Sequence, residues 1–319
     1  MPDQRRIKEI VIPLVLLLAA FLTVLIFPPV GVVLGLIAPA PLILVNLQRG
    51  RMAGLMGIAA LFVMILAAMG PKAAVIFAAE YGVLSAAMAE SVRFQFSMEK
   101  SVFFSALASA SLSFLALFLV FAGKETTLAE LFQNQVKEHM EQSLETLKSM
   151  GKDKAELDVM KAAAEKVAGA FAVSYPAFIA VGNLMCAAVN FVLVQGLWRK
   201  MYGDTAFFPR RLSAAVLPDQ AIWPLILSAG ALFAGGDELY AAGLNVFVVM
   251  LAVYFLQGLA IVVHVLETKT VPILFWVLAL FLIFTQPIVM GIVTGLGVFD
   301  MWVDFRKIRL PAPGEKPEE

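Results

Sequence analysis

The amino-acid sequence predicts an all-α protein that crosses a membrane several times. Of its 319 residues, 61% are hydrophobic and only 15% are charged, whereas soluble domains are about 45–50% apolar and about 25% charged. Apolar runs of about 20 residues, the length that spans a hydrocarbon core, follow one another along the chain. Water-soluble folds cannot bury this much apolar surface, so we expect a bundle of transmembrane helices in contact with lipid.

Five apolar segments fall within residues 1–122, which we expect to form a five-span bundle. The first resembles a signal peptide, but it ends in Pro28-Pro29 without a small-residue cleavage pattern, so we expect it to be retained. The second contains Pro39 and Pro41, whose missing N–H groups interrupt helical hydrogen bonding, and it should be kinked or partly unwound. The five segments run over about 10–27, 31–47, 52–69, 73–88 and 101–122.

A hydrophilic insert over residues 123–166 interrupts the apolar runs. Thr127 and Glu130 fit a capping box at its start, and a second helix should begin after Gly151. We therefore expect an external amphipathic helical hairpin, which packs either on its own bundle and the bilayer surface or on a partner protein. The apolar residues of its first helix recur at three- and four-residue spacing: Leu128, Leu131, Phe132, Val136, Met140, Leu144 and Leu147.

The remaining spans should lie within residues 167–305, followed by a disordered tail over 306–319. The number of spans depends on a short apolar stretch, about Ala221–Ala234. If this stretch crosses the membrane, the chain has nine spans and the basic C-terminal residues lie outside; if it is re-entrant, the chain has eight. Hydropathy favours nine and charge favours eight, and we expect eight. The three clear segments are about 167–197, 239–264 and 271–298, the last broken near Thr285-Gln286-Pro287.

Basic residues near the ends of the expected spans set the orientation. Arg5, Arg6 and Lys8 place the N-terminus in the cytoplasm. Alternation of the spans then puts the basic turn at 49–51 and the basic loop at 198–211 on the same side, which agrees with the rule that cytoplasmic loops are enriched in lysine and arginine.

Glu80 lies near the middle of the fourth expected span. An ionised carboxylate at that depth costs several kcal/mol unless it is paired, hydrated or protonated, so such a residue is a candidate functional site. Glu80 should carry a proton or a cation, contact a substrate, or serve as a hydrogen-bonded structural residue of the bundle.

Four amide side chains complete the candidate site. Asn183 and Asn190 are seven residues apart and so share one face of a helix. Gln257 lies on the next long span, and Gln286 lies at the Pro287 break, where freed backbone carbonyls line cavities in other membrane proteins. Buried amides act either as hydrogen-bonding contacts between helices or as the lining of a solute pocket. The predicted ligand-binding residues are therefore Glu80, Asn183, Asn190, Gln257 and Gln286.

Several chemistries lack their motifs in this sequence. There is no GxxxxGK[ST], HExxH or GxSxG motif, and the single cysteine and two distant histidines make no metal motif, so we expect no catalytic residues, cofactor or metal site. The net charge of zero gives no basic surface for nucleic acid. Close helix contacts are expected at three Gly-x-x-x-Gly pairs: Gly31 and Gly35, Gly50 and Gly54, and Gly291 and Gly295.

Two stretches resemble the YybS-like family of bacterial membrane proteins. They are 254–260 (YFLQGLA) and 297–307 (GVFDMWVDFRK), and the second contains the more specific pattern Phe-Asp-x-Trp-x-Asp-Phe-Arg. The resemblance covers essentially the whole chain and implies a multi-pass protein of the bacterial cytoplasmic membrane. That family has no established activity.

The N-terminal half is also similar to the substrate-binding (S) components of energy-coupling-factor transporters. The similarity lies in 50–54 (GRMAG), which opens the third span after a kinked second one. In that group the membrane protein binds a small vitamin or metal and separate subunits hydrolyse ATP, although this chain has more spans and a long insert. The resemblance implies binding or transport of a small solute. The alternative is a structural or regulatory scaffold that contacts envelope proteins through residues 123–166.

Overall fold

Every secondary-structure element in the described part of the chain is a helix. The computed structural model describes residues 34–308 apart from 122–127, 150–153, 204–206, 209–211 and 270, so the first expected span and the end of the tail lie outside it. Five helices are long and apolar enough to cross a membrane, and the chain is therefore a helical membrane protein. They are α4 (Arg51–Met69), the continuous helix α5–η1–α6 (Pro71–Arg93), α7 (Met98–Phe121), α9 (Lys154–Tyr202) and α11 (Asp237–Thr268).

The expected eight spans are not all found among these residues. The helices α12 (Ile273–Thr285) and α13 (Pro287–Val303) meet at Gln286 with a bend of 100°, and the described part of the chain holds six spans if the pair counts as one. The break predicted before Pro287 is therefore present and is sharper than a kink. The segment Leu34–Arg49 is shorter than a span, and α10 (Ile222–Ala231) has only ten residues.

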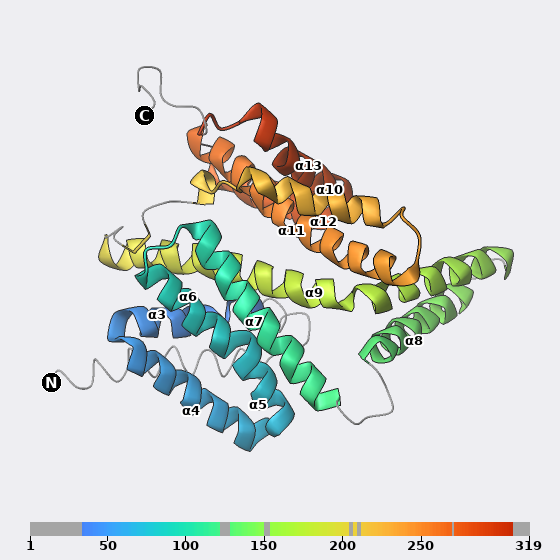
Figure 1. Ribbon diagram of the computed structural model, residues 1–319, viewed down its shortest axis with the longest axis horizontal. Coiled ribbons are helices and arrows are strands. Elements are labelled where there is room, and N and C mark those ends of the chain that lie inside the picture. The colour runs from blue at the N-terminus through green and yellow to red at the C-terminus, as the bar shows by residue number, and fades with distance from the viewer. Residues whose placement is uncertain are drawn as a thin grey trace.

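The helix ends gather at two opposite ends of the bundle (Figure 1). The ends of α3 (Pro39–Arg49), α6 (Val83–Arg93) and α9 lie at one end, together with the starts of α4 and α7. This end is rich in charge: Arg51 and Arg93 both contact the Glu90 carboxylate, with N···O distances of 2.6 and 3.0 Å. The turn between α4 and α5 and the turn between α10 and α11 lie at the opposite end.

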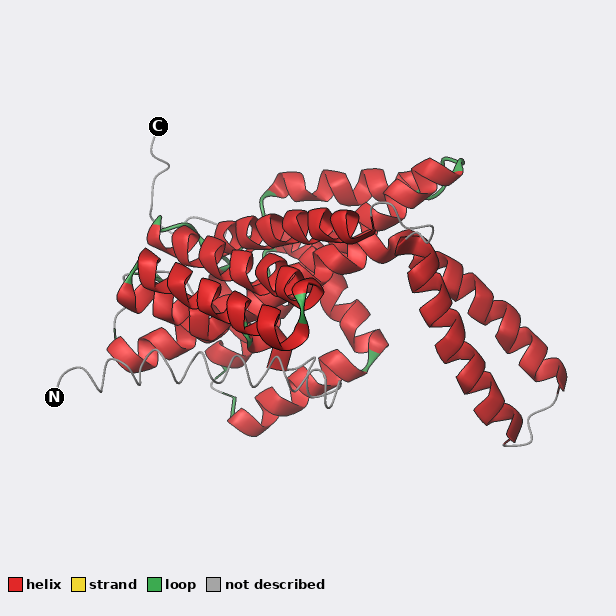
Figure 2. Ribbon diagram, turned by 90° about the horizontal axis from the view of Figure 1, so that it is seen from below, coloured by secondary structure: helices red, strands yellow, loops and turns green. Residues whose placement is uncertain are grey.

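The insert contributes two helical segments that lie side by side. The helix α8 (Leu128–Ser149) packs along the first part of α9, and Figures 1 and 2 show both extending beyond the other helices. We expected a separate helix over 154–166, but α9 runs unbroken for 49 residues. That is about 74 Å at 1.5 Å per residue, more than twice the hydrocarbon thickness of about 30 Å, so its first part lies beyond the bundle.

Asn245 repairs the hydrogen bonding of α9 beside Pro176, which lies inside that helix. The Ala177 N–H donates to Asn245 Oδ1 at 2.8 Å, and Asn245 Nδ2 donates to the Val173 carbonyl at 2.9 Å. In an undisturbed helix Ala177 would donate to Val173 directly. The amide of α11 therefore replaces one helical hydrogen bond of α9 and holds the two helices together.

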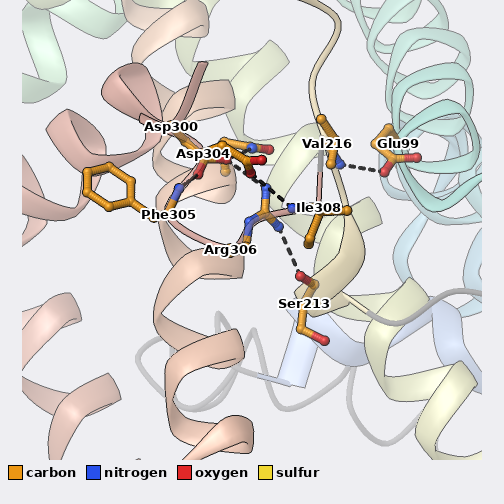
Figure 3. Close-up of polar contacts among 9 residues, drawn as sticks. Glu99, Ser213, Val216, Asp300, Asp304, Phe305, Arg306 and Ile308 are labelled. Carbon is orange, nitrogen blue, oxygen red and sulfur yellow. Dashed lines mark hydrogen bonds and ion pairs between the residues drawn. The ribbon is translucent and has the colours of Figure 1, made fainter. Parts of the chain in front are cut away.

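A buried ion pair fastens the C-terminal segment (Figure 3). Arg306 Nη2 lies 2.8 Å from Asp300 Oδ2, and each side chain is only 1% exposed. Gln257 of α11 donates to the same Asp300 oxygen at 2.7 Å. Asp304 adopts a left-handed conformation with φ of 45°, which turns the chain back after α13. Arg306, the first residue of the expected disordered tail, is therefore fixed in the protein interior.

This C-terminal clasp, which consists of Asp300, Arg306 and Gln257, also reaches the loop before α10. Arg306 Nη1 donates to the Ser213 carbonyl at 3.0 Å. Three residues further along, the Val216 N–H donates to Glu99 Oε1 at 2.8 Å. The loop is thereby tied to the start of α7 on one side and to α13 on the other, as Figure 3 shows.

Two glycines allow α11 and α13 to pack closely. A Cβ added to Gly258 would lie 1.8 Å from the Val293 carbonyl oxygen, and one added to Gly297 would lie 2.0 Å from the Tyr254 carbonyl oxygen. The sequence pattern indicated a different pair, Gly291 and Gly295. An added Cβ at either of those has nothing within 4 Å, so the expected contact at that pair is wrong.

Gly258→Ala should strongly destabilise the protein, because the methyl group meets backbone that cannot rotate away. Overpacking costs about 1–3 kcal/mol, and a backbone clash should lie at or above the upper end of that range. The thermal midpoint of the detergent-solubilised protein measures the effect. Gly295→Ala is the matched control and should leave the midpoint within about 1 °C; equal midpoints for the two variants would contradict the close crossing.

Arg306→Met should also destabilise the protein, because it leaves the buried Asp300 carboxylate without its counter-charge. Loss of one partner of a buried ion pair costs about 3–5 kcal/mol. The free energy of unfolding in denaturant is the appropriate measurement. Lys307→Met removes the same charge from an exposed neighbour and should change stability by less than about 0.5 kcal/mol. Equal free energies of unfolding for the two variants would show that the clasp does not stabilise the protein.

Candidate functional site

Glu80 lies in a π-helical turn within its span. The turn η1 (Ala78–Gly82) separates α5 (Pro71–Phe77) from α6, and the Val83 N–H donates to the Ala78 carbonyl five residues back. Where a helix returns from this pairing to the ordinary four-residue pairing, one carbonyl is left without a helical donor. Such single π-turns are frequent at functional sites.

The carboxylate of Glu80 is half-buried within the bundle. It lies close enough to the Cys186 thiol of α9 and to the Tyr81 hydroxyl to interact with both electrostatically. It forms no hydrogen bond or ion pair with the residues that the structure describes. A partly buried acid within a span is a candidate functional residue.

The hydroxyl of Ser109 lies within hydrogen-bond distance of three oxygen atoms, two from the π-turn and one from α9. Its Oγ lies 2.9 Å from the Ala79 carbonyl oxygen and 3.0 Å from the Glu80 carbonyl oxygen. It also contacts Asn183 Oδ1 at hydrogen-bond distance. Asn183 Nδ2 donates to the Ile179 carbonyl at 2.9 Å, which turns the amide oxygen toward Ser109.

Asn190 lies two helical turns further along α9 and is fully buried. Its Nδ2 donates to the carbonyls of Leu36 and Cys186, both at 2.7 Å, while its Oδ1 is buried with no hydrogen-bond partner among the described residues. The Leu36 carbonyl precedes the interruption of the helix at Ala38, directly before Pro39. The helix break that the prolines predicted is therefore present, and α9 supplies a donor for it.

The five predicted site residues do not form one site. Asn183 is linked through Ser109 to the backbone carbonyl of Glu80, and Asn190 of the same helix contacts the backbone before the break at Ala38. Gln257 belongs to the C-terminal clasp, and Gln286 is exposed at the bend between α12 and α13.

Ser109 was missed by the sequence analysis. A signal for it exists, because serines recur every four residues along one face of α7 and all are buried: Ser101, Ser105, Ser109 and Ser113.

Two largely apolar spaces lie elsewhere among the described helices. One, of about 100 Å³, lies between α7, α9 and α11 and includes Glu99 and Gln257 in its lining. The other, of about 630 Å³, is a groove between α9, α11 and α12. Glu80 lines neither of them, so the solute pocket expected beside it stays a prediction. In the described part of the chain no group of three His, Cys, Asp or Glu side chains is placed to hold a metal ion.

Comparisons with known proteins establish the family of the chain. No curated protein and no solved structure matches it, so the resemblances to the YybS-like family and to the S components receive no support there. A family model described as "Predicted membrane protein (DUF2232)" matches residues 13–301. With that match over most of its length, the chain belongs to the DUF2232 family of predicted membrane proteins.

Proposed function

We propose that this protein binds a small solute inside the membrane and transports it, with Glu80, Asn183 and Asn190 as the binding residues. One observation carries the proposal: the half-buried Glu80 carboxylate has no hydrogen bond or ion pair with the described residues although it lies within a span. A bundle that keeps such a group bears a cost in stability, and the cost is explained if the group has a ligand.

The surroundings of Glu80 favour a solute that carries positive charge or moves with a cation or proton. The carboxylate is accompanied by acceptor oxygens, namely the carbonyls at the π-turn and the unpartnered Asn190 Oδ1. Two interrupted helices also meet here, since a Cβ added to Gly35 would lie 2.9 Å from the Tyr81 hydroxyl. Transporters commonly build their binding sites from discontinuous helices whose unwound carbonyls face the substrate or its coupling ion.

The resemblance of residues 50–54 to S components suggests how transport would be powered. A membrane-embedded binding protein of that kind depends on separate subunits for ATP hydrolysis, in keeping with the lack of a P-loop motif in this sequence. We place the protein in the bacterial cytoplasmic membrane with its N-terminus in the cytoplasm, because basic residues favour that side.

A scaffold role is the second candidate, and the hairpin gives it less support than the sequence suggested. A docking hairpin would present its apolar stripe outward. Instead Met140 and Leu144 of α8 are half-buried and line hollows shared with Lys161 of α9. These two described residues of the stripe are therefore turned toward α9, and the contact with envelope proteins is the weaker proposal.

Glu80→Gln should abolish solute binding while leaving the protein folded. The purified protein is screened by thermal unfolding against small organic cations and vitamins, because a ligand at 100 times its Kd stabilises the folded state by about 2.7 kcal/mol. We expect at least one compound to raise the unfolding midpoint of the natural protein. The same compound should not raise the midpoint of Glu80→Gln. Glu238→Gln, which neutralises an exposed carboxylate, should keep the full response. A compound that stabilises both variants equally would place the binding site elsewhere.

A further inference from the structure

We propose that the groove between α9, α11 and α12 binds one molecule of phosphatidylethanolamine. An acyl chain of the lipid lies along the groove, and its zwitterionic headgroup lies between Arg199 of α9 and Glu267 of α11, which both line the groove. Glu80 is not part of this lining, so the lipid site goes beyond the proposed function and does not depend on it.

The groove lies where α12 leaves space beside α9 and α11. Ile283 is the one buried residue among the thirteen described residues of α12. Side chains four residues apart share one face of a helix, and on α12 such a face lines the groove, with Trp276, Leu280 and Phe284. A space of about 630 Å³ therefore has protein on three sides, whereas the outer surface of a single helix offers a lipid only one.

The lining and the length of the groove fit an acyl chain. Water does not fill an apolar space of this kind, because a buried water molecule needs two to four polar partners. The part of α9 that lines the groove, from Met185 to Arg199, rises by about 21 Å at 1.5 Å per residue. One leaflet contributes about 15 Å, half of the hydrocarbon thickness of about 30 Å. The groove can thus hold the chain of one leaflet with the headgroup at its end.

The register of α9 and α11 places the two charged residues at the same level. The Ala177 N–H donates to Asn245 Oδ1, 68 positions further along the chain. Two pairs of groove residues have the same separation, each pair eleven residues, or about three turns, beyond the previous one: Ala188 and Leu256, then Arg199 and Glu267. The guanidinium and the carboxylate therefore lie opposite each other in the last turns of helices that end at Tyr202 and Thr268.

This pair of opposite charges matches the headgroup of phosphatidylethanolamine. Arg199 Nη2 donates to the Phe208 carbonyl at 3.1 Å, which fixes the guanidinium at the end of the groove, and its five N–H donors exceed what one carbonyl accepts. Arginine binds phosphate through parallel hydrogen bonds, and the ammonium group of ethanolamine can donate to the Glu267 carboxylate as a lysine ammonium would.

The same charges disfavour the other common headgroups. Phosphatidylglycerol carries a negative charge without a positive one, and would bring it close to Glu267. Phosphatidylcholine carries both charges, but its quaternary ammonium has no N–H to donate. The residues at the end of the groove therefore select an ethanolamine headgroup by charge and by hydrogen bonding together.

Lipid binding is measured with the full-length protein in detergent. Phosphatidylethanolamine, phosphatidylcholine and phosphatidylglycerol with identical acyl chains are added separately, and native mass spectrometry counts the molecules that each protein retains. The thermal midpoint is followed in parallel titrations. We expect one retained phosphatidylethanolamine, a saturable rise of the midpoint, and an affinity about fivefold or more above that of the other two lipids. Equal retention of all three would show unselective contact with lipid and would overturn the inference.

Glu267→Gln tests the headgroup contact. It should reduce the affinity for phosphatidylethanolamine by about tenfold, to the level of phosphatidylcholine, because the amide carries no charge. Glu238→Gln is the matched control, since it makes the same change in an exposed residue at the opposite end of α11, and it should leave the lipid affinity unchanged. A preference for phosphatidylethanolamine that survives in Glu267→Gln would contradict the assigned headgroup site.

Val192→Trp tests the seat of the acyl chain without touching the headgroup residues. Val192 lines the groove and is exposed to it, so a tryptophan there should fill the space and weaken the binding of phosphatidylethanolamine by about tenfold. Val277→Trp, on an exposed position of α12 outside the groove lining, should bind the lipid as the natural protein does. Undiminished binding by Val192→Trp would overturn the inference. So would a dimer that Val192→Trp dissociates, seen by light scattering, because the groove would then belong to a second copy of the chain.

Discussion

Hydrogen bonds between polar side chains and the backbone of neighbouring helices organise this bundle. Water is absent from the hydrocarbon core, so each backbone polar group must be satisfied by the protein itself. The helices depart from regular α-helical pairing near Ala38, at the π-turn Ala78–Gly82 and beside Pro176 of the continuous helix α9. A polar side chain from a neighbouring helix contacts the backbone at each of these places. Asn190 reaches the Leu36 carbonyl, Ser109 reaches the π-turn, and Asn245 bridges the gap beside Pro176.

Much of this framework could be predicted because its causes are local. Apolar length predicts a span wherever it reaches the thickness of the bilayer, and α4 and α11 were found on that basis. Proline removes an N–H whatever its surroundings, so the interruptions at Pro39 and Pro287 followed directly from the sequence. The seven-residue spacing of Asn183 and Asn190 likewise predicted a shared face, and both side chains are buried in the bundle.

The features that escaped prediction depend on which helices become neighbours. A π-turn needs one extra residue in a helix, and nothing in the composition around Glu80 marks that insertion. Gly258 and Gly291 look alike in sequence, but only Gly258 faces another backbone. Gln257 resembled a pocket residue because its partner, Asp300, lies 43 positions away. Ser109 looked like an ordinary small residue of a packed helix until the carbonyls of Ala79 and Glu80 were placed beside it.

The C-terminal clasp and the surroundings of Glu80 differ in how their polar groups are paired. In the C-terminal clasp, Asp300 has a matched donor on each oxygen, from Arg306 and Gln257 on one and the Phe305 N–H on the other. Because these hydrogen bonds join α11, α13 and the C-terminal segment, the clasp rigidifies its surroundings. Ser109, by contrast, joins the π-turn to Asn183 of α9, and the Glu80 carboxylate of that turn has no hydrogen bond or ion pair with the described residues. A ligand of Glu80 would therefore bind at a turn that Ser109 already joins to α7 and α9, so solute binding should also stabilise the contacts among these helices.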